Sequence, residues 1–179
     1  MRIKSMFLVG AMIVLMSVAG GCENKKAAVE SPKPAVQFSS TLPSDLSNIP
    51  VSAGGAGNAE MINSVMVTDK IEVKVNKKNK LSVVGWAANV KAVTIPPTVI
   101  IQLTSSSGNN SFYAVATRIA SKKRQDVADY FKNPKLENSS YQLDADISSI
   151  PQGQYLISIL QSDGKYVIKT DTVRRLEIE

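Results

Sequence analysis

Short runs in which apolar and polar residues alternate recur through the last two thirds of this chain. In residues 71–75 the apolar side chains occupy every second position, which is the period of a strand with one buried face. Further runs are rich in branched and aromatic residues, which favour strands, and they cover 81–87, 98–103, 112–120, 141–147, 155–160, 166–169 and 173–178, with 63–68 as an additional candidate. The pattern therefore predicts about eight short strands.

Turn residues separate these runs. Residues 76–80 are polar and predict a hairpin loop, and residues 105–110 form a second loop rich in Ser, Gly and Asn. Asp163-Gly164 lies between two strand patterns, and because glycine accepts a positive φ without steric cost, this pair predicts a hairpin turn. Pro96-Pro97 favours an extended entry into the run that begins at Thr98.

One segment interrupts the strand pattern. Within residues 124–131, Val127, Ala128 and Phe131 have helical spacing, and Asn133-Pro134 follows, so a short helix is predicted there. About eight strands with one crossover helix in some 120 residues favour an all-β fold. We expect an immunoglobulin-like antiparallel β-sandwich of about seven to eight strands.

The amino end has a different pattern. Arg2 and Lys4 precede an apolar run at 6–18, and small residues at 19–21 lead into Cys22, the one cysteine of the chain. A run of about a dozen apolar residues is too short to cross roughly 30 Å of hydrocarbon as a permanent helix. The order of basic, apolar and small residues is that of an export signal.

The sequence Ala19-Gly20-Gly21-Cys22 resembles the lipobox of bacterial lipoproteins. This resemblance implies a signal peptide at 1–21 and acyl chains such as palmitate on Cys22, which hold the mature protein on a membrane without a transmembrane helix. The alternative is an ordinary secretory signal followed by a chance cysteine. In bacteria with a known sorting rule an aspartate after the cysteine favours the inner membrane, so Glu23 implies the outer membrane rather than the inner one.

Residues 22–58 are dominated by Lys, Ala, Ser, Pro and Gly. A flexible chain of some 35 residues spans about 30 to 35 Å. We predict a tether at 22–58, with turns near Leu46 and Ile49 able to dock, and a β-sandwich domain at 59–179.

Composition excludes several kinds of chemistry. The chain has a formal net charge of +6 and no histidine. A serine triad needs a base such as histidine, and zinc sites use Cys and His, so neither is expected in a chain whose one cysteine is predicted to carry lipid. No cofactor and no metal site is predicted. The basic residues lack the interleaved aromatic residues of a nucleic-acid platform, so we expect no nucleic-acid partner.

Two short motifs carry alternative interpretations. Ser162-Asp163-Gly164-Lys165 has the spacing of a catalytic S-x-x-K motif, but we expect it to form an exposed turn. Asp144 and Asp146 point the same way on a predicted strand, which would suit calcium or a glycosidase. Because no third oxygen ligand accompanies them, we expect a solvated strand face.

A set of short motifs occurs in a defined order along the predicted domain. They are Gly85-Trp86-Ala87, Tyr113-Ala114, Arg124-Gln125-Asp126-Val127-Ala128, Asn133-Pro134, Ser140-Tyr141 and Pro151-Gln152-Gly153-Gln154-Tyr155. The set resembles the extracytoplasmic immunoglobulin-like module often appended to bacterial membrane glycosyltransferase-like proteins. That family usually has proline where this chain has Gln125. The resemblance implies a fold and no catalytic residue, and a fold alone does not give a function.

Trp86 is predicted to mark the core by filling the space between the two sheets, as in immunoglobulin folds. The alternative is an exposed platform for a sugar ring, with Tyr113 or Tyr141 on the same open face.

Arg124 and Asp126 are predicted to fix the helix through caps and an ion pair. The alternative is a recognition patch on a loop held by a rigid scaffold, made by Lys122, Lys123, Arg124, Asp126 and Asp129.

These observations favour a non-enzymatic, lipid-anchored lipoprotein of the cell envelope, whose β-sandwich binds a protein or glycan partner. One alternative is a structural accessory of a surface polysaccharide or glycosyl-transfer assembly. A second is an enzyme that uses only carboxylates and lysines.

Overall fold

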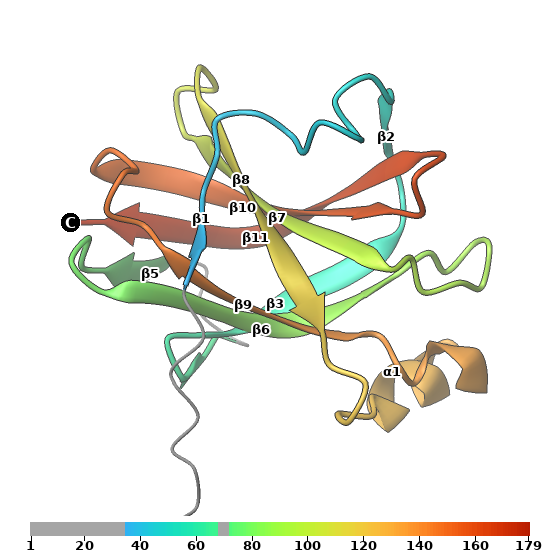
Figure 1. Ribbon diagram of the computed structural model, residues 1–179. Coiled ribbons are helices and arrows are strands. Elements are labelled where there is room, and N and C mark those ends of the chain that lie inside the picture. The colour runs from blue at the N-terminus through green and yellow to red at the C-terminus, as the bar shows by residue number, and fades with distance from the viewer. Residues whose placement is uncertain (1–34, 68–71) are drawn as a thin grey trace, which may run out of the picture. The chain divides into compact units, whose positions relative to one another are not determined.

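The computed structural model describes residues 35–67 and 72–179. These residues form an all-β, sandwich-like fold with one short α-helix, which confirms the predicted fold class (Figure 1). The predicted signal peptide at 1–21, Cys22, Glu23 and the first part of the predicted tether lie outside the described residues. Among the described residues, no helix combines the length and apolar character needed to span a bilayer.

The described strands are β1 (Val36–Gln37), β2 (Val51–Ala53), β3 (Ala56–Ile62), β4 (Val65–Met66), β5 (Glu72–Val75), β6 (Lys80–Ala88), β7 (Thr98–Ser105), β8 (Ser111–Arg118), β9 (Ser140–Asp146), β10 (Gly153–Ser162) and β11 (Val167–Ile178). The α-helix α1 (Gln125–Tyr130) and a short 3₁₀ helix, η1 (Pro134–Leu136), lie between β8 and β9.

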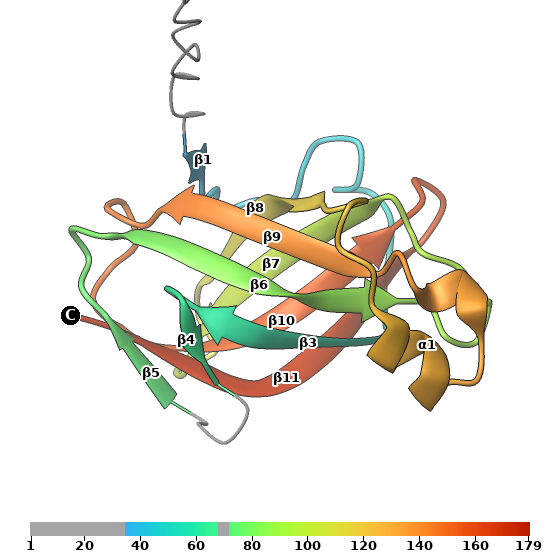
Figure 2. The ribbon, with the colours of Figure 1, turned by 90° about the horizontal axis from the view of Figure 1, so that it is seen from below.

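The strands form two layers that β8 joins. The hydrogen-bonded order is β2-β11-β10-β7-β8-β9-β6-β3-β4. Most of β8 pairs with β7, whereas its last residues, Thr117 and Arg118, pair with β9 in the other layer (Figure 2). The long strands are antiparallel, as predicted, but β1 pairs in parallel with β9, and β2 and β5 pair in parallel with β11.

Two of the predicted connections differ from the structure. Residues 76–79 do not close a hairpin, because β5 pairs with β11 while β6 pairs with β3 and β9, so this turn crosses between layers. The runs predicted at 166–169 and 173–178 belong to the single strand β11. The turn at Asp163-Gly164 joins β10 and β11 as predicted, and Gly164 has a φ of 89°.

The folded domain begins earlier than the predicted boundary at residue 59. Leu46 is only 1% exposed and packs in a cluster with Ile100, Leu160 and Val167 on the outer face of the β7–β10–β11 layer. β2 adds to β11, and β3 already begins at Ala56. The predicted tether at 22–58 is therefore wrong from residue 35 onward, because scattered apolar residues among its prolines and glycines pack on the sheet.

The main core fills the space between the layers. It contains inward-facing residues of the long strands, including Leu81, Val83, Ile101, Leu143, Ile157 and Leu176. Tyr141 is completely buried there, and its hydroxyl donates a hydrogen bond of 3.1 Å to the backbone carbonyl of Asn58. Gly85 lies beside this contact, and a Cβ atom at Gly85 would lie 1.9 Å from the same carbonyl oxygen. The close approach of β3 to β6 therefore requires glycine at position 85.

Candidate functional site

Helix α1 covers one end of the sandwich. The Arg124 carbonyl accepts hydrogen bonds from the backbone N–H groups of Val127 and Ala128, and the helix ends at Tyr130. The Asn133 side chain then accepts a bond from the Lys135 N–H and begins η1. Apolar residues of both helices pack with β6 and the loop after it, in a small second core made by Ala88, Val127 and Leu136, with Trp86, Val90, Ile95 and Phe131 around it.

Trp86 belongs to this second core and not to the space between the sheets, so its predicted position is wrong. Along β6 the inward-facing residues include Val83 and Ala87, and Trp86 lies half-buried on the opposite face. Successive side chains of a strand point to opposite faces. The inward position next to Trp86 is Gly85, and the Tyr141 ring approaches β6 there. Tyr141 therefore occupies the central place that was predicted for Trp86.

Trp86 packs against one aromatic ring at the end of the helix, and that ring contacts a second one. Its ring centroid lies 5.9 Å from that of Phe131, with a 63° angle between the planes. The centroids of Phe131 and Tyr130 are 4.9 Å apart in an edge-to-face contact. Tyr130 is 80% exposed, although aromatic side chains carry a large apolar surface. The three rings form an aromatic cluster that is open to solvent.

The alternative platform for a sugar ring, with Trp86 and Tyr113 or Tyr141 on one open face, is not formed. Tyr141 is buried in the main core, and Tyr113 packs beside the Leu46 cluster on the other layer. The sequence does contain a signal for the aromatic cluster, because Tyr130 and Phe131 are adjacent aromatic residues at the end of the predicted helix. Only Phe131 was used in that prediction, for its helical spacing.

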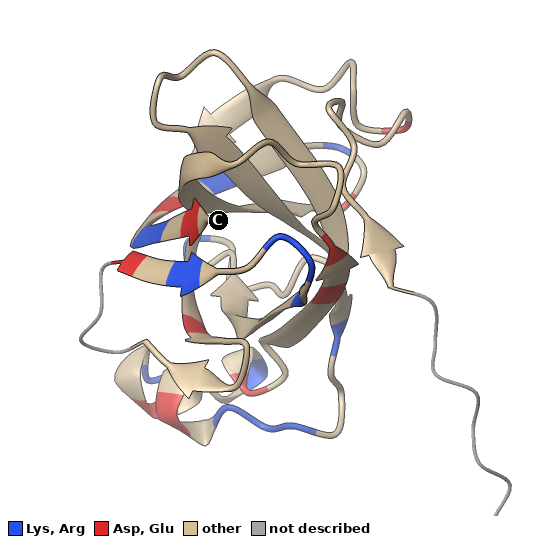
Figure 3. Cartoon of the chain, turned by 90° about the vertical axis from the view of Figure 1, so that its left-hand side faces the viewer, with Lys and Arg blue, Asp and Glu red and all other residues tan. Residues whose placement is uncertain are grey.

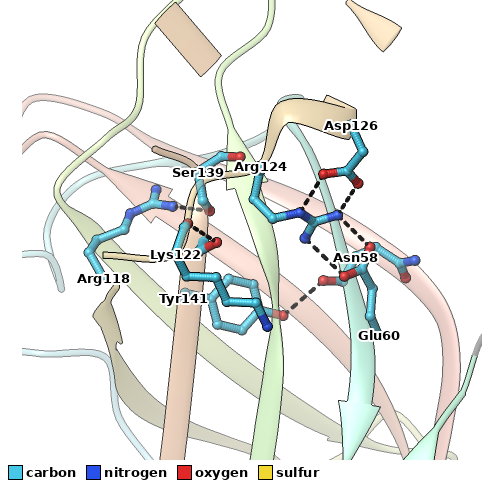
Figure 4. Close-up of polar contacts among 9 residues, drawn as sticks. Asn58, Glu60, Arg118, Lys122, Arg124, Asp126, Ser139 and Tyr141 are labelled. Atoms are coloured by element: carbon cyan, nitrogen blue, oxygen red, sulfur yellow. Dashed lines mark hydrogen bonds and ion pairs between the residues drawn. The ribbon is translucent and has the colours of Figure 1, made fainter. Parts of the chain in front are cut away.

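Arg124 joins the start of α1 to strand β3. The pairing of β3 with β6 shifts register between Ala59 and Met61, so Glu60 occupies a β-bulge. The two terminal nitrogens of Arg124 each lie 2.9 Å from a Glu60 carboxylate oxygen (Figure 4). On its other edge the guanidinium donates to both oxygens of Asp126, at 2.8 and 2.5 Å. We call Glu60, Arg124 and Asp126 the arginine clip.

The clip keeps all three side chains in fixed positions. Hydrogen bonding to Asp126 and to Glu60 raises the pKa of Arg124. In return the Arg124 guanidinium holds the pKa of Asp126 below its ordinary value. Arg124 itself is only 8% exposed, so it is an internal tie and not a surface charge. The predicted ion pair between Arg124 and Asp126 is present, whereas Arg124 makes no side-chain cap hydrogen bond.

The other residues of the predicted recognition patch use their polar groups locally. Lys123 pairs with Glu137 at 2.6 Å, and Asp129 accepts a bond from Gln125 at 2.8 Å. Lys122 is exposed, and its backbone carbonyl accepts a bond from the Ser140 hydroxyl. Lys and Arg are interspersed with Asp and Glu along the ribbon (Figure 3). The patch residues are therefore neighbours in the chain, and two of their three basic side chains, Lys123 and Arg124, are paired with carboxylates.

Arg118, at the end of β8, also stabilises this end of the domain, although no local sequence signal indicates its role. Its guanidinium donates to the backbone carbonyls of Pro96, Ala87 and Ser139, at distances from 2.7 to 3.1 Å. Burial lowers its pKa to about 10, which still leaves it charged near neutrality. Arg118 thereby holds together the loop before β7, the end of β6 and the segment that leads into β9.

The aromatic cluster and the clip border one open depression. Its volume is about 340 Å³, and it is lined by Trp86, Asp126, Val127, Tyr130 and Phe131. Asp126 is the one charged group of this lining, and its side chain is 65% exposed. We call this the aromatic depression. It combines ring faces with a single carboxylate held at a fixed angle, which is an arrangement suited to binding.

The remaining sequence candidates lie elsewhere. Asp144 is exposed and accepts a bond from Gln142, while Asp146 accepts bonds from Gln37 and from the Ser148 N–H. The Ser162 hydroxyl donates to the Tyr166 carbonyl within the β10–β11 turn. Within residues 35–67 and 72–179 no three acidic, Cys or His side chains are grouped as a metal site would require.

No known protein family, curated protein or solved structure matches this chain.

Proposed function

We propose that this chain is an exported lipoprotein of the bacterial cell envelope and that its sandwich is a non-enzymatic module that binds a protein or glycan partner. Lipid on Cys22 anchors it, in the outer membrane rather than the inner one. The order of basic, apolar and small residues before Cys22 supports export and acylation, and Glu23 supports the choice of membrane.

The aromatic depression is the observation that carries the binding function. Trp86, Tyr130 and Phe131 line one open depression together with Asp126, and a concave site that combines aromatic side chains with a polar group is a candidate binding site. The arginine clip fastens the start of the helix to β3, and Arg118 holds the end of β6 to neighbouring segments. A rigid support of this kind keeps a site in its binding geometry and lowers the entropy lost on association.

The anchor is tested by mass spectrometry of the mature protein purified from membranes, with Cys22→Ala as the control. We expect a polypeptide that begins at Cys22 and carries the added mass of acyl chains. Separation of inner and outer membranes then locates the protein. A bare sulfur at Cys22, or an uncleaved leader on cytosolic protein, would contradict the anchor.

The binding function is tested by capture from solubilised envelopes with the lipidated protein as bait. We expect a defined protein or polysaccharide to be enriched over the same bait carrying Trp86→Ala and Tyr130→Ala. Equal recovery with both baits would exclude the aromatic depression as the site. Recovery of nothing by either bait would contradict the binding function itself.

A further inference from the structure

We propose that the aromatic depression binds a glycan, with one sugar ring lying against Trp86 and Tyr130 while its hydroxyl groups donate to Asp126. This inference rests on the proposed binding function and names the chemical class of the partner.

The ring faces supply the apolar half of the site. A pyranose ring presents C–H groups on its face, and these pack well against an aromatic surface because the face of an aromatic ring carries partial negative charge. Tyr130 stands in solvent at 80% exposure, and Phe131 packs edge-on against both Tyr130 and Trp86. Phe131 therefore holds the other two rings at fixed angles, which lowers the entropy cost of ordering them on binding.

Asp126 supplies the polar half. A carboxylate has about four lone-pair positions, and the Arg124 guanidinium occupies one on each oxygen, at 2.8 and 2.5 Å. Because the Asp126 side chain remains 65% exposed, its carboxylate is accessible from the open side. The clip also keeps the group ionised, since its pKa lies below the ordinary value. Asp126 is thus a fixed acceptor for a hydroxyl donor, and hydrogen bonds to a charged acceptor are stronger than neutral ones.

A hydroxylated occupant fits this lining better than an apolar or a basic protein side chain. An apolar side chain would remove water from the Asp126 oxygens without replacing its hydrogen bonds, which is unfavourable. A lysine or arginine side chain would have to share this carboxylate with Arg124, which already donates to both of its oxygens. Sugar hydroxyls donate without bringing a second cation. The volume of about 340 Å³ lies at the lower end of the range for small-molecule sites.

The test is a titration of the full-length protein with soluble oligosaccharides of glucose, galactose and N-acetylglucosamine. Trp86 is the single tryptophan of the chain, so its fluorescence reports on the site directly. We expect at least one glycan to change the emission saturably. Tyr130→Ala should weaken binding about tenfold or more, and Tyr130→Phe should retain most of the affinity because it keeps the ring face.

A second pair of variants separates the carboxylate from general charge effects. Asp126→Asn should weaken binding, because an amide offers one acceptor oxygen instead of two. Asp163→Asn removes an equal charge in the exposed β10–β11 turn and should leave the affinity unchanged. Circular dichroism and the unfolding midpoint of each variant show whether the fold is retained.

The outcomes separate glycan binding at the aromatic depression from the more general proposed function of binding a partner. If a glycan binds equally well to Tyr130→Ala, the inference is overturned and the binding function stands. If a basic peptide changes the emission and no glycan does, the partner class is wrong. Loss of self-association in Tyr130→Ala would assign the rings to a contact between copies and would also overturn the inference. If envelope capture and glycan titration both give nothing, the proposed function fails as well.

Discussion

The two terminal nitrogens of Arg124 lie 2.9 Å from the two carboxylate oxygens of Glu60, so the first turn of α1 is fastened to the bulge of β3. The residues are 64 positions apart in the sequence. A fork-to-fork contact of this kind fixes orientation as well as distance, because the guanidinium and the carboxylate must share a plane. The position of the aromatic rings at the helix therefore depends on a contact with β3, the strand that pairs with β6.

Replacing Arg124 by methionine should destabilise the domain. The change leaves the carboxylates of Glu60 and Asp126 close together without their shared cation, and Glu60 is partly buried. We expect a loss of about 2 kcal/mol in the free energy of unfolding in urea, below the value for fully buried pairs because Asp126 is well solvated. Lys123→Met is the control: its ion pair with Glu137 is largely exposed, so the loss should stay below about 1 kcal/mol. Equal losses in both variants would contradict the role of the clip.

The stability contributed by Asp126 should disappear in acid. Its pKa is lower in the folded protein than in the unfolded chain because Arg124 hydrogen-bonds the ionised form. The contribution is therefore complete above the unfolded pKa of about 3.9 and is lost as pH falls through the lower folded value. The difference in unfolding free energy between wild type and Asp126→Asn should be present at pH 7 and shrink steadily below about pH 4. A difference that stays constant down to pH 2 would show that another effect of the substitution dominates.

Alanine at position 85 should prevent normal packing of β3 on β6. The added Cβ would lie 1.9 Å from the Asn58 carbonyl oxygen and 2.8 Å from the Tyr141 hydroxyl. We expect a loss of about 3 kcal/mol or more, measured by thermal and chemical unfolding. Gly108→Ala provides the comparison: Gly108 has a φ of 76° but no atom near its Cβ position, so only backbone strain of about 1 kcal/mol is expected. A mild effect at position 85 would mean that β3 can move away from β6 without a loss of stability.

Leu46 should contribute to stability as a core residue, although it lies in the segment predicted as a tether. It is 1% exposed among Ile100, Leu160 and Val167. Leu46→Ala should cost about 3 kcal/mol in the free energy of unfolding, whereas Leu156→Ala, at a position 40% exposed, should cost well under that.

The domain boundary can be tested by truncation. A chain that begins at residue 35 should fold, and one that begins at residue 59 should be strongly destabilised, because it lacks β2 and the start of β3. Equal stability of the two fragments would show that the folded domain begins at residue 59, as predicted from the sequence.

The central strands and the helix could be predicted because their signals are local. The alternation through residues 81–87 and the spacing of Val127, Ala128 and Phe131 are present in the sequence itself, and the structure has β6 and α1 at those positions. The single strand β11 could not be predicted, because Thr170, Asp171 and Thr172 resemble a turn and are extended only through pairing with β10 and contacts to neighbouring residues. Such pairing depends on contacts with another strand, which the local sequence pattern does not show.

The site was predicted only in part for the same reason. The ion pair of Arg124 with Asp126 lies within three residues and was expected from the sequence. The contribution of Glu60 depends on a bulge in β3, and the outward position of Trp86 depends on the space that Gly85 leaves for Tyr141. Alternation predicts that Trp86 and Gly85 face opposite ways, but it does not say which of the two faces the core.

The parallel pairing of β1 with β9 has a mechanical consequence. Val36 and Gln37 pair with Ala145 and Asp146, and a single bridge from Ser39 to Tyr113 follows. If the chain is held at its amino end, as we propose, any tension between membrane and partner reaches β1 and the buried Phe38 before it reaches the long strands. Release of residues 36–45, up to the buried Leu46, would lengthen the connection by up to about 35 Å, at 3.3 to 3.6 Å for each residue. This segment would then act as an extensible link that yields under load while the sandwich and its aromatic rings stay folded.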